Sequence, residues 1–258
     1  MDNFESVGAL ELGRIIDKLP KRKATDEGIT IEILRMAVSA IEREFVDIIN
    51  ESLREGCFPD SWKVSTIVPI PKIEKAKNAK DFRPINMLPI YEKVLELVVK
   101  KQVEKYLETN EIITEHQSGF RKQFSCETAI QTVIDEWKLN ISERRVVGVI
   151  FMDLKRAFET VDRELLIKKM LQYGIRGKVL EWFRSYLNNR KQRVWFNGEY
   201  SGIIKTKCGV PQGSVLGPLL FNVYINDIVD VCPEDCKIKM FADDTLVYVT
   251  GDNSAEDG

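Results

Sequence analysis

A pair of adjacent carboxylates near the end of the chain constrains its fold more than any other feature. Asp243 and Asp244 lie between two short apolar runs of strand composition, residues 238–241 and 245–249. The short polar connection predicts a β-hairpin with both aspartates at its tip. Two like charges at one tip repel each other, and a hard divalent cation such as Mg²⁺ would relieve that repulsion. An ordinary solvated turn is the alternative, because aspartate is common in turns.

A second carboxylate follows a nearly continuous apolar run upstream. Residues 146–152 read Val-Val-Gly-Val-Ile-Phe-Met, which predicts a strand that is buried on both faces. The run ends at Asp153. A carboxylate at the end of a buried strand is costly unless it is paired or bound to a metal, so Asp153 is a candidate for one of these roles.

A glycine-rich loop separates the two carboxylate segments. Residues 209–218, Gly-Val-Pro-Gln-Gly-Ser-Val-Leu-Gly-Pro, contain three glycines and two prolines and lead into an apolar helix predicted at 219–229. Glycines there allow the backbone to approach a bulky ligand closely. In this order and spacing, the three segments together indicate one functional site.

These segments resemble the reverse transcriptase domain of non-LTR (LINE-type) retrotransposons. Phe-x-Asp-Leu-x-x-Ala-Phe at 151–158 resembles the first palm motif, Gly-Val-Pro-Gln-Gly-Ser at 209–214 the second, and Phe-Ala-Asp-Asp at 241–244 the metal-binding hairpin. Residues 70–72 and 81–85 resemble finger motifs, and residues 117–121 resemble a further motif.

The match begins at about residue 8 and keeps every motif in family order. One segment, 23–29, departs from the Gly-Pro-Asp-Gly turn that the family usually has there.

The resemblance implies an α+β fold with the fingers and palm of a right-hand polymerase. An antiparallel palm sheet would pack on helices, and the thumb would be absent. Residues 1–145 would form an N-terminal extension and the fingers, and residues 146–258 the palm, with 176–210 as a candidate fingers insertion.

The resemblance also assigns roles to individual residues. Nucleotidyl transfer is an in-line displacement in which two metals about 3.5–4 Å apart stabilise the attacking and leaving oxygens. Asp153, Asp243 and Asp244 would be catalytic and would bind two Mg²⁺ ions, with Mn²⁺ as a substitute. Among the nucleotide-binding residues, Lys72 and Arg83 would bind the triphosphate. Phe158 would pack against the sugar, and Gln212 and Gly213 would contact the nascent base pair and template. Arg121 would contact a template phosphate.

Periodicity predicts the remaining elements. Apolar residues recur at three- to four-residue steps in 10–19 and 31–53, which predicts amphipathic helices. Residues 191–196 and 202–207 flank Asn197-Gly198, which is typical of a hairpin turn. We also expect a strand at 64–70 and helices at 89–107, 127–141, 164–173 and 177–187.

Composition and charge limit which partners and which cellular compartment we expect for this protein. The net charge of −2 argues mildly against a nucleic-acid binder, but basic residues cluster at 72–83, 100–105 and 190–193. No run approaches the roughly 18 apolar residues of a membrane span, so no membrane partner is expected. The N-terminus lacks a signal core, and the five cysteines lack zinc-site spacing. We therefore expect an intracellular protein with reduced thiols, in the nucleus or cytoplasm.

The leading hypothesis is an RNA-directed DNA polymerase that takes an RNA template, a DNA primer or target and deoxynucleoside triphosphates. The intact element would add a thumb and an endonuclease. A catalytically inactive relic that binds RNA is the first alternative. An RNA-copying viral polymerase is the second, although such enzymes usually have Gly before the aspartate pair, where this chain has Ala242.

Overall fold

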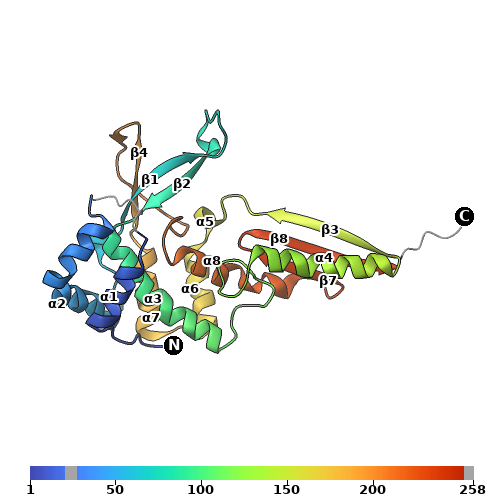
Figure 1. Ribbon diagram of the computed structural model, residues 1–258, viewed down its shortest axis with the longest axis horizontal. Helices are drawn as coiled ribbons and strands as arrows, with labels where there is room; N and C mark the ends of the chain where they lie inside the picture. Colours follow the sequence, from blue (N-terminus) through green and yellow to red (C-terminus); the bar gives the residue numbers. More distant parts are fainter. Residues whose placement is uncertain (21–27, 253–258) are drawn as a thin grey trace, which may run out of the picture.

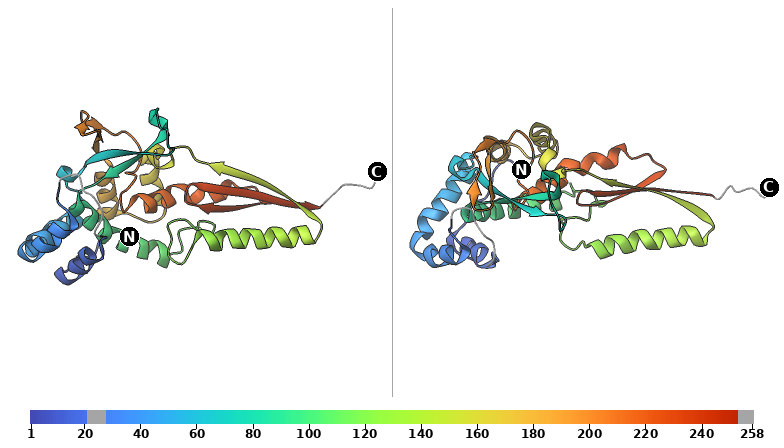
Figure 2. Two further views of the ribbon diagram at one scale, coloured as in Figure 1. Left: turned by 45° about the horizontal axis from the view of Figure 1, so that its top comes forward. Right: turned by 90° about the horizontal axis from the view of Figure 1, so that it is seen from above.

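The structure, a computed structural model, describes residues 1–20 and 28–252, so the departure at 23–29 lies mostly outside the described residues. The molecule is elongated (Figure 1). Most helices gather around one sheet at one end, and a second sheet with a single long helix reaches away at the other (Figure 2). The chain thus folds as a mixture of helices and sheets, as predicted.

The N-terminal helices form where the apolar periodicity predicts them. They are α1 (Ala9–Lys18) and α2 (Ile31–Glu55). The Thr30 hydroxyl accepts the Ile33 N–H and caps the start of α2. Gly56, at φ 66°, adopts the left-handed conformation that ends it. Both helices pack on elements of the central core, so they belong to the same folded unit.

The core is built on α3 (Ile90–Thr109), α6 (Arg163–Gln172) and α7 (Gly177–Leu187), all predicted, and on α8 (Gly217–Ile225). The helix expected at 219–229 therefore starts earlier and ends at residue 225, where a 3₁₀ segment, η3 (Asn226–Val231), continues it.

Aromatic side chains fill the middle of this core. Trp182 stacks on Tyr186 at 5.3 Å between ring centroids and meets Phe58 edge-on at 5.4 Å. All three side chains are fully buried. Such ring pairs add to the hydrophobic free energy of burial, and they join α7 to the segment that follows α2.

The first sheet is mixed. Its β1 (Val64–Pro71), predicted at 64–70, pairs antiparallel with β2 (Phe82–Met87) and parallel with β4 (Lys191–Phe196). Between β1 and β2 lies η2 (Ala79–Asp81), and η1 (Asp60–Trp62) precedes β1.

The hairpin expected after β4 is confirmed only in part. Asn197 and Gly198 have φ angles of 51° and 84°, the positive values that a tight hairpin turn requires. The returning strand is broken into β5 (Glu199–Tyr200) and β6 (Ile204–Lys205), both paired with β4.

The second sheet is antiparallel, with β8 (Asp244–Asp252) between β3 (Arg145–Asp153) and β7 (Cys236–Phe241). The predicted aspartate hairpin is therefore confirmed as β7–β8, but only Asp243 lies in its turn, because Asp244 is the first residue of β8. One face is covered by α4 (Cys126–Ser142), whose Trp137 lies 5.9 Å from the Tyr248 ring.

The prediction that residues 146–152 form a strand is confirmed, but the prediction that the strand is buried on both faces is wrong. In the part of the chain that the structure describes, β3 is an edge strand that pairs only with β8. Ile150 and Phe151 are 63% and 77% exposed. An apolar run predicts apolar surroundings on both faces, whereas the exposure of Ile150 and Phe151 shows that α4, which lies along this sheet, does not enclose the strand.

The five cysteines, all within residues 28–252, are free thiols. Across the described residues, no helix is both long and apolar enough to cross a membrane.

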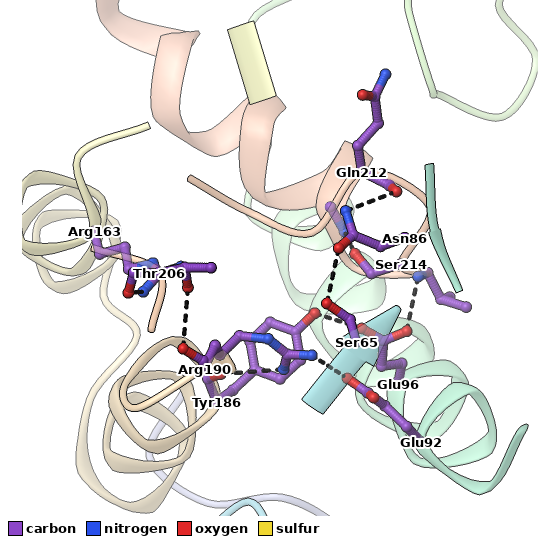
Figure 3. Close-up of polar contacts among 12 residues, drawn as sticks. Ser65, Asn86, Glu92, Glu96, Arg163, Tyr186, Arg190, Thr206, Gln212 and Ser214 are labelled. Atoms are coloured by element: carbon purple, nitrogen blue, oxygen red, sulfur yellow. Dashed lines mark hydrogen bonds and ion pairs between the residues drawn. The ribbon is translucent and has the colours of Figure 1, made fainter. Parts of the chain in front are cut away.

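A buried ion pair joins α3 to the start of β4. Arg190 Nη2 lies 2.8 Å from Glu92 Oε1, and the two side chains are 3% and 0% exposed. Burial raises the pKa of Glu92, although the Arg190 charge, which favours the ionised carboxylate, opposes that rise. On the next turn of α3, Glu96 accepts the Tyr186 hydroxyl (Figure 3). Because water reaches neither charge, each one needs the other for electrostatic compensation.

This pair yields a stability prediction. Arg190→Met should destabilise the fold by about 3–5 kcal/mol, because it leaves a buried carboxyl without its counter-ion. A carboxyl with a raised pKa binds its proton more tightly in the folded state, so the variant's stability should fall as the pH rises from about 5 to 8. Denaturant titration at several pH values measures both effects.

The same substitution at Arg184, whose pair with Glu164 is exposed, is the matched control and should cost less than about 1 kcal/mol. Equal losses in the two variants would contradict the importance of the buried pair.

Candidate active site

The three aspartates meet at one end of the second sheet. Asp153 is directly opposite Asp244 across the β3–β8 pairing. Opposite residues of antiparallel strands project from the same face, so these two carboxylates share a face. Phe241 pairs with Asp244 across β7–β8, which leaves Ala242 and Asp243 as the two-residue turn. The register thus brings together carboxylates that are far apart in the sequence, with Asp244 as the direct partner of Asp153.

The turn that carries Asp243 is strained. Ala242 has a φ of 60° and is buried. Glycine or asparagine usually occupies such a position, and a residue with a Cβ in the left-handed region costs on the order of 1–3 kcal/mol. The conformation persists only because contacts around it hold it, and it determines where the Asp243 carboxylate lies.

The donor set fits Mg²⁺. Asp153 and Asp244 are exposed and Asp243 is half-buried, so all three can offer hard oxygen ligands to a cation. Mg²⁺ usually keeps several waters and binds through one or two carboxylates and substrate phosphates. Among residues 1–20 and 28–252, no three His, Cys, Asp or Glu side chains are gathered closely enough to enclose an ion by themselves. The open arrangement therefore suits a cation that is shared with a substrate.

The glycine-rich loop packs against the segment that follows β3. The N–H groups of Gly209 and Val210 donate to the carbonyls of Val161 and Phe158, both at 2.8 Å. Phe158 belongs to the short helix α5 (Ala157–Thr160), which follows Asp153 closely. The loop therefore lies beside the end of the strand that carries a catalytic candidate.

The middle of the loop contacts β2. The Gln212 carbonyl accepts the Asn86 N–H at 2.8 Å and its Nδ2 at 3.2 Å (Figure 3). Gly213 has a φ of 113°, and a Cβ there would lie 2.7 Å from the Asn86 carbonyl oxygen. Close backbone approach is therefore confirmed, but the neighbour is a strand. The Gln212 side chain points away from Asn86 (Figure 3), and the nucleotide contacts of Gln212 and Gly213 stay predictions.

Two charged residues hold the ends of this loop. At its start, Arg163 Nε donates to the Gly209 carbonyl and Nη1 to the Thr206 carbonyl, both at 2.9 Å. In its second half, the fully buried Glu96 accepts the Val215 N–H at 2.8 Å. Burial lowers the pKa of Arg163 and raises the pKa of Glu96.

Sequence reasoning missed both residues, because charges inside a helix usually indicate a solvated face. The available signal was the position of Glu92 and Glu96, four residues apart, on a stretch of α3 whose other residues are apolar except Lys93.

Phe158 lies between the strand end and the glycine loop. Its ring stacks on Phe221 at 5.0 Å and meets Phe120 edge-on at 6.1 Å. The side chain is half-buried, so part of the ring remains accessible. This placement suits the predicted contact with a sugar, which stays a prediction.

Lys72 and Arg83 lie on the other sheet. Arg83 is opposite Ile70 in the β1–β2 pairing, and the Lys72 N–H donates to the Asp81 carbonyl at 2.8 Å. Side chains alternate between the two faces of the β1–β2 hairpin, so the exposed side chains of Lys72 and Arg83 lie on the same face. The structure thus brings these two together, but on a different sheet from the aspartates (Figure 1).

Arg121 contacts its own loop. Nη1 donates to the carbonyls of Thr114 and Gln117 at 2.8 and 3.1 Å, and the guanidinium lies 4.4 Å from the centre of the Phe124 ring. Burial lowers the pKa of Arg121. Its template contact stays a prediction beside this structural role.

Comparison with known proteins agrees with the motifs. The family model described as reverse transcriptase (RNA-dependent DNA polymerase) matches residues 70–257. The RNA-directed DNA polymerase from the mobile element jockey of Drosophila melanogaster is 30% identical over 92% of this chain. The probable RNA-directed DNA polymerases from transposon BS and transposon X-element of the same species are 30% and 29% identical over 72% and 84% of the chain.

The chain spans 20–27% of the length of these relatives. The match to the family model covers most of the chain and includes the whole second sheet and all three aspartates. The chain therefore belongs to the reverse transcriptase family.

Proposed function

We propose that the chain is the polymerase domain of a non-LTR retrotransposon reverse transcriptase, which adds deoxynucleotides to a primer 3′-hydroxyl on an RNA template. The observation that carries the proposal is the register that sets Asp153 opposite Asp244, beside the turn of Asp243. Family membership and the transposon relatives support it.

Each group of residues has a role in this reaction. Asp153, Asp243 and Asp244 bind two Mg²⁺ ions, or Mn²⁺ in their place. When bound, the ions stabilise the charge on the attacking and leaving oxygens. Lys72 and Arg83 bind the triphosphate through charge-assisted hydrogen bonds. Phe158 packs against the sugar and leaves no room for a 2′-hydroxyl, while Gln212, Gly213 and Arg121 contact the base pair and template.

The two sheets correspond to two parts of a right-hand polymerase. The mixed sheet with the N-terminal helices forms the fingers, and the antiparallel sheet forms the palm. The pairing of β4 with β1 supports the assignment of residues 176–210 to the fingers. We place α4 with the palm, because it packs on β3 and β7 although it ends before residue 145. A thumb and an endonuclease belong to the intact, longer protein.

An inactive relic that binds RNA is the second candidate. Primer extension on RNA and DNA templates, with each type of nucleotide and with or without Mg²⁺, separates the two functions and also tests an RNA-copying activity.

The first prediction for the site concerns the metal ligands. Asp153→Asn and Asp243→Asn keep the side-chain shape but remove a charged ligand, so primer extension should fall by several orders of magnitude while the fold survives. Asp235→Asn, at an exposed position before β7, is the matched control and should extend normally. Near-normal extension by either ligand variant would refute the two-metal assignment.

The second concerns sugar selection. Phe158→Val should open space beside C2′ and raise the use of ribonucleotides relative to deoxynucleotides, measured as the ratio of the two kcat/KM values. Phe120→Leu removes a ring that touches Phe158 and avoids a β-branched residue at the positive φ of position 120 (58°), so its ratio should stay unchanged. An unchanged ratio in Phe158→Val would mean that the residue only packs in the core.

The third concerns the triphosphate. Lys72→Ala and Arg83→Ala should each weaken nucleotide binding by roughly 1.5–3 kcal/mol, about ten- to a hundredfold in affinity. Single-turnover extension at increasing nucleotide concentration measures this. Lys75→Ala, in the loop between the same two strands, serves as the control. A defect in template binding alone would contradict the assignment.

A further inference from the structure

A short segment runs along the outer edge of the aspartate hairpin. The Met240 N–H donates to the His116 carbonyl and the Ser118 N–H donates to the Met240 carbonyl, both at 2.8 Å. These bonds form a parallel bridge between Gln117 and Met240. The segment 116–119 therefore lies beside β7, next to the turn that carries Asp243.

Gln117 binds the backbone of this turn through its side-chain amide. Nε2 donates to the Ala242 carbonyl at 3.1 Å, and the Ala242 N–H donates to Oε1 at 3.0 Å. Oε1 also accepts the Gly119 N–H at 2.7 Å. The side chain is 1% exposed, so these bonds are protected from water. One side chain thus satisfies both backbone groups of the residue that holds the positive φ angle.

The approach of this segment to the turn is as close as a backbone permits. A Cβ on Gly119 would lie 2.0 Å from the Ala242 nitrogen, so only glycine fits there. Asn222 of α8 donates to the Gly119 carbonyl at 2.9 Å, and Arg121 donates to the Gln117 carbonyl at 3.1 Å. The segment that carries Gln117 is therefore itself held at two points, at Gln117 and at Gly119, and this fixes the position of the Gln117 side chain relative to the turn.

We infer that Gln117 is a positioning residue, which fixes the left-handed turn at Ala242 and thereby directs the neighbouring Asp243 carboxylate toward the metal ions. The inference rests on the proposed function. Gln117 touches no substrate atom in this role and acts only through the backbone of the turn. Its loss should loosen the turn and weaken metal binding, because partners that orient metal ligands typically contribute about 10- to 100-fold in affinity or activity.

The chain offers a matched control for this contact. Gln102 makes the same two-point amide contact with the backbone of Glu5, at 2.8 and 2.9 Å, on the surface of α3. Gln117→Met and Gln102→Met each keep the side-chain length and remove both hydrogen-bonding atoms. If Gln117→Met does not fold, Gln117→Asn keeps the amide on a shorter stem and is compared with Gln102→Asn.

The test has two readouts. Hydrogen–deuterium exchange without metal reports on the amides of residues 242–245. Titration calorimetry with Mn²⁺, together with the Mg²⁺ concentration for half-maximal primer extension, reports on the metal site. We expect Gln117→Met to raise exchange at the turn and to weaken metal binding by about tenfold or more, and Gln102→Met to do neither.

Two results would overturn the inference. One is unchanged exchange at the turn in Gln117→Met. The other is faster exchange with an unchanged metal requirement, which would make Gln117 a structural residue only. Absence of metal-dependent extension in the unaltered protein is a different outcome, because it would refute the proposed function while the exchange measurement still decides whether Gln117 holds the turn.

Discussion

The arrangement of the site depends on the buried pair of Arg190 and Glu92. Two charges that are removed from water must satisfy each other, so few relative positions of α3 and the start of β4 are compatible with the fold. The next turn of α3 extends this constraint, because Glu96 binds both the Tyr186 hydroxyl and the Val215 N–H. The helix that carries the buried carboxylates therefore also holds the end of the glycine-rich loop.

That loop connects the two sheets. Its Gln212 carbonyl binds Asn86 of β2, and the backbone at Gly209 and Val210 binds the segment that follows Asp153. The β1–β2 hairpin, which carries Lys72 and Arg83, is thereby linked to the strand end that carries a metal-binding candidate, through hydrogen bonds close to 3 Å.

The N-terminal helices pack on the same core. The Trp182 indole in α7 donates to Ser52 of α2 at 3.0 Å. They are therefore part of the core, although the match to the family model begins only at residue 70.

The aspartate hairpin obeys a different constraint. The pairing of β3 with β8 is sufficient to place Asp153 opposite Asp244. The position of Asp243 requires more, because Ala242 adopts a conformation that an alanine rarely takes without support. The support comes from Gln117 and Gly119, which lie more than a hundred residues earlier in the chain. The geometry of the proposed metal site thus depends both on the strand register of the sheet and on one buried side-chain amide.

The sequence by itself determined the local elements and the motif residues. Helix periodicity, the Asn197-Gly198 turn and the Asp243-Asp244 hairpin depend on neighbours within a few positions, and all of them are found. Only the tertiary structure decided that β3 is an exposed edge strand, that the strand after Asn197-Gly198 is broken, and that Glu96, Arg163 and Gln117 hold the site. The physical reason is distance along the chain. Apolar periodicity shows which residues avoid water but not which surface covers them, and the bond from Val215 to Glu96 joins residues 119 positions apart.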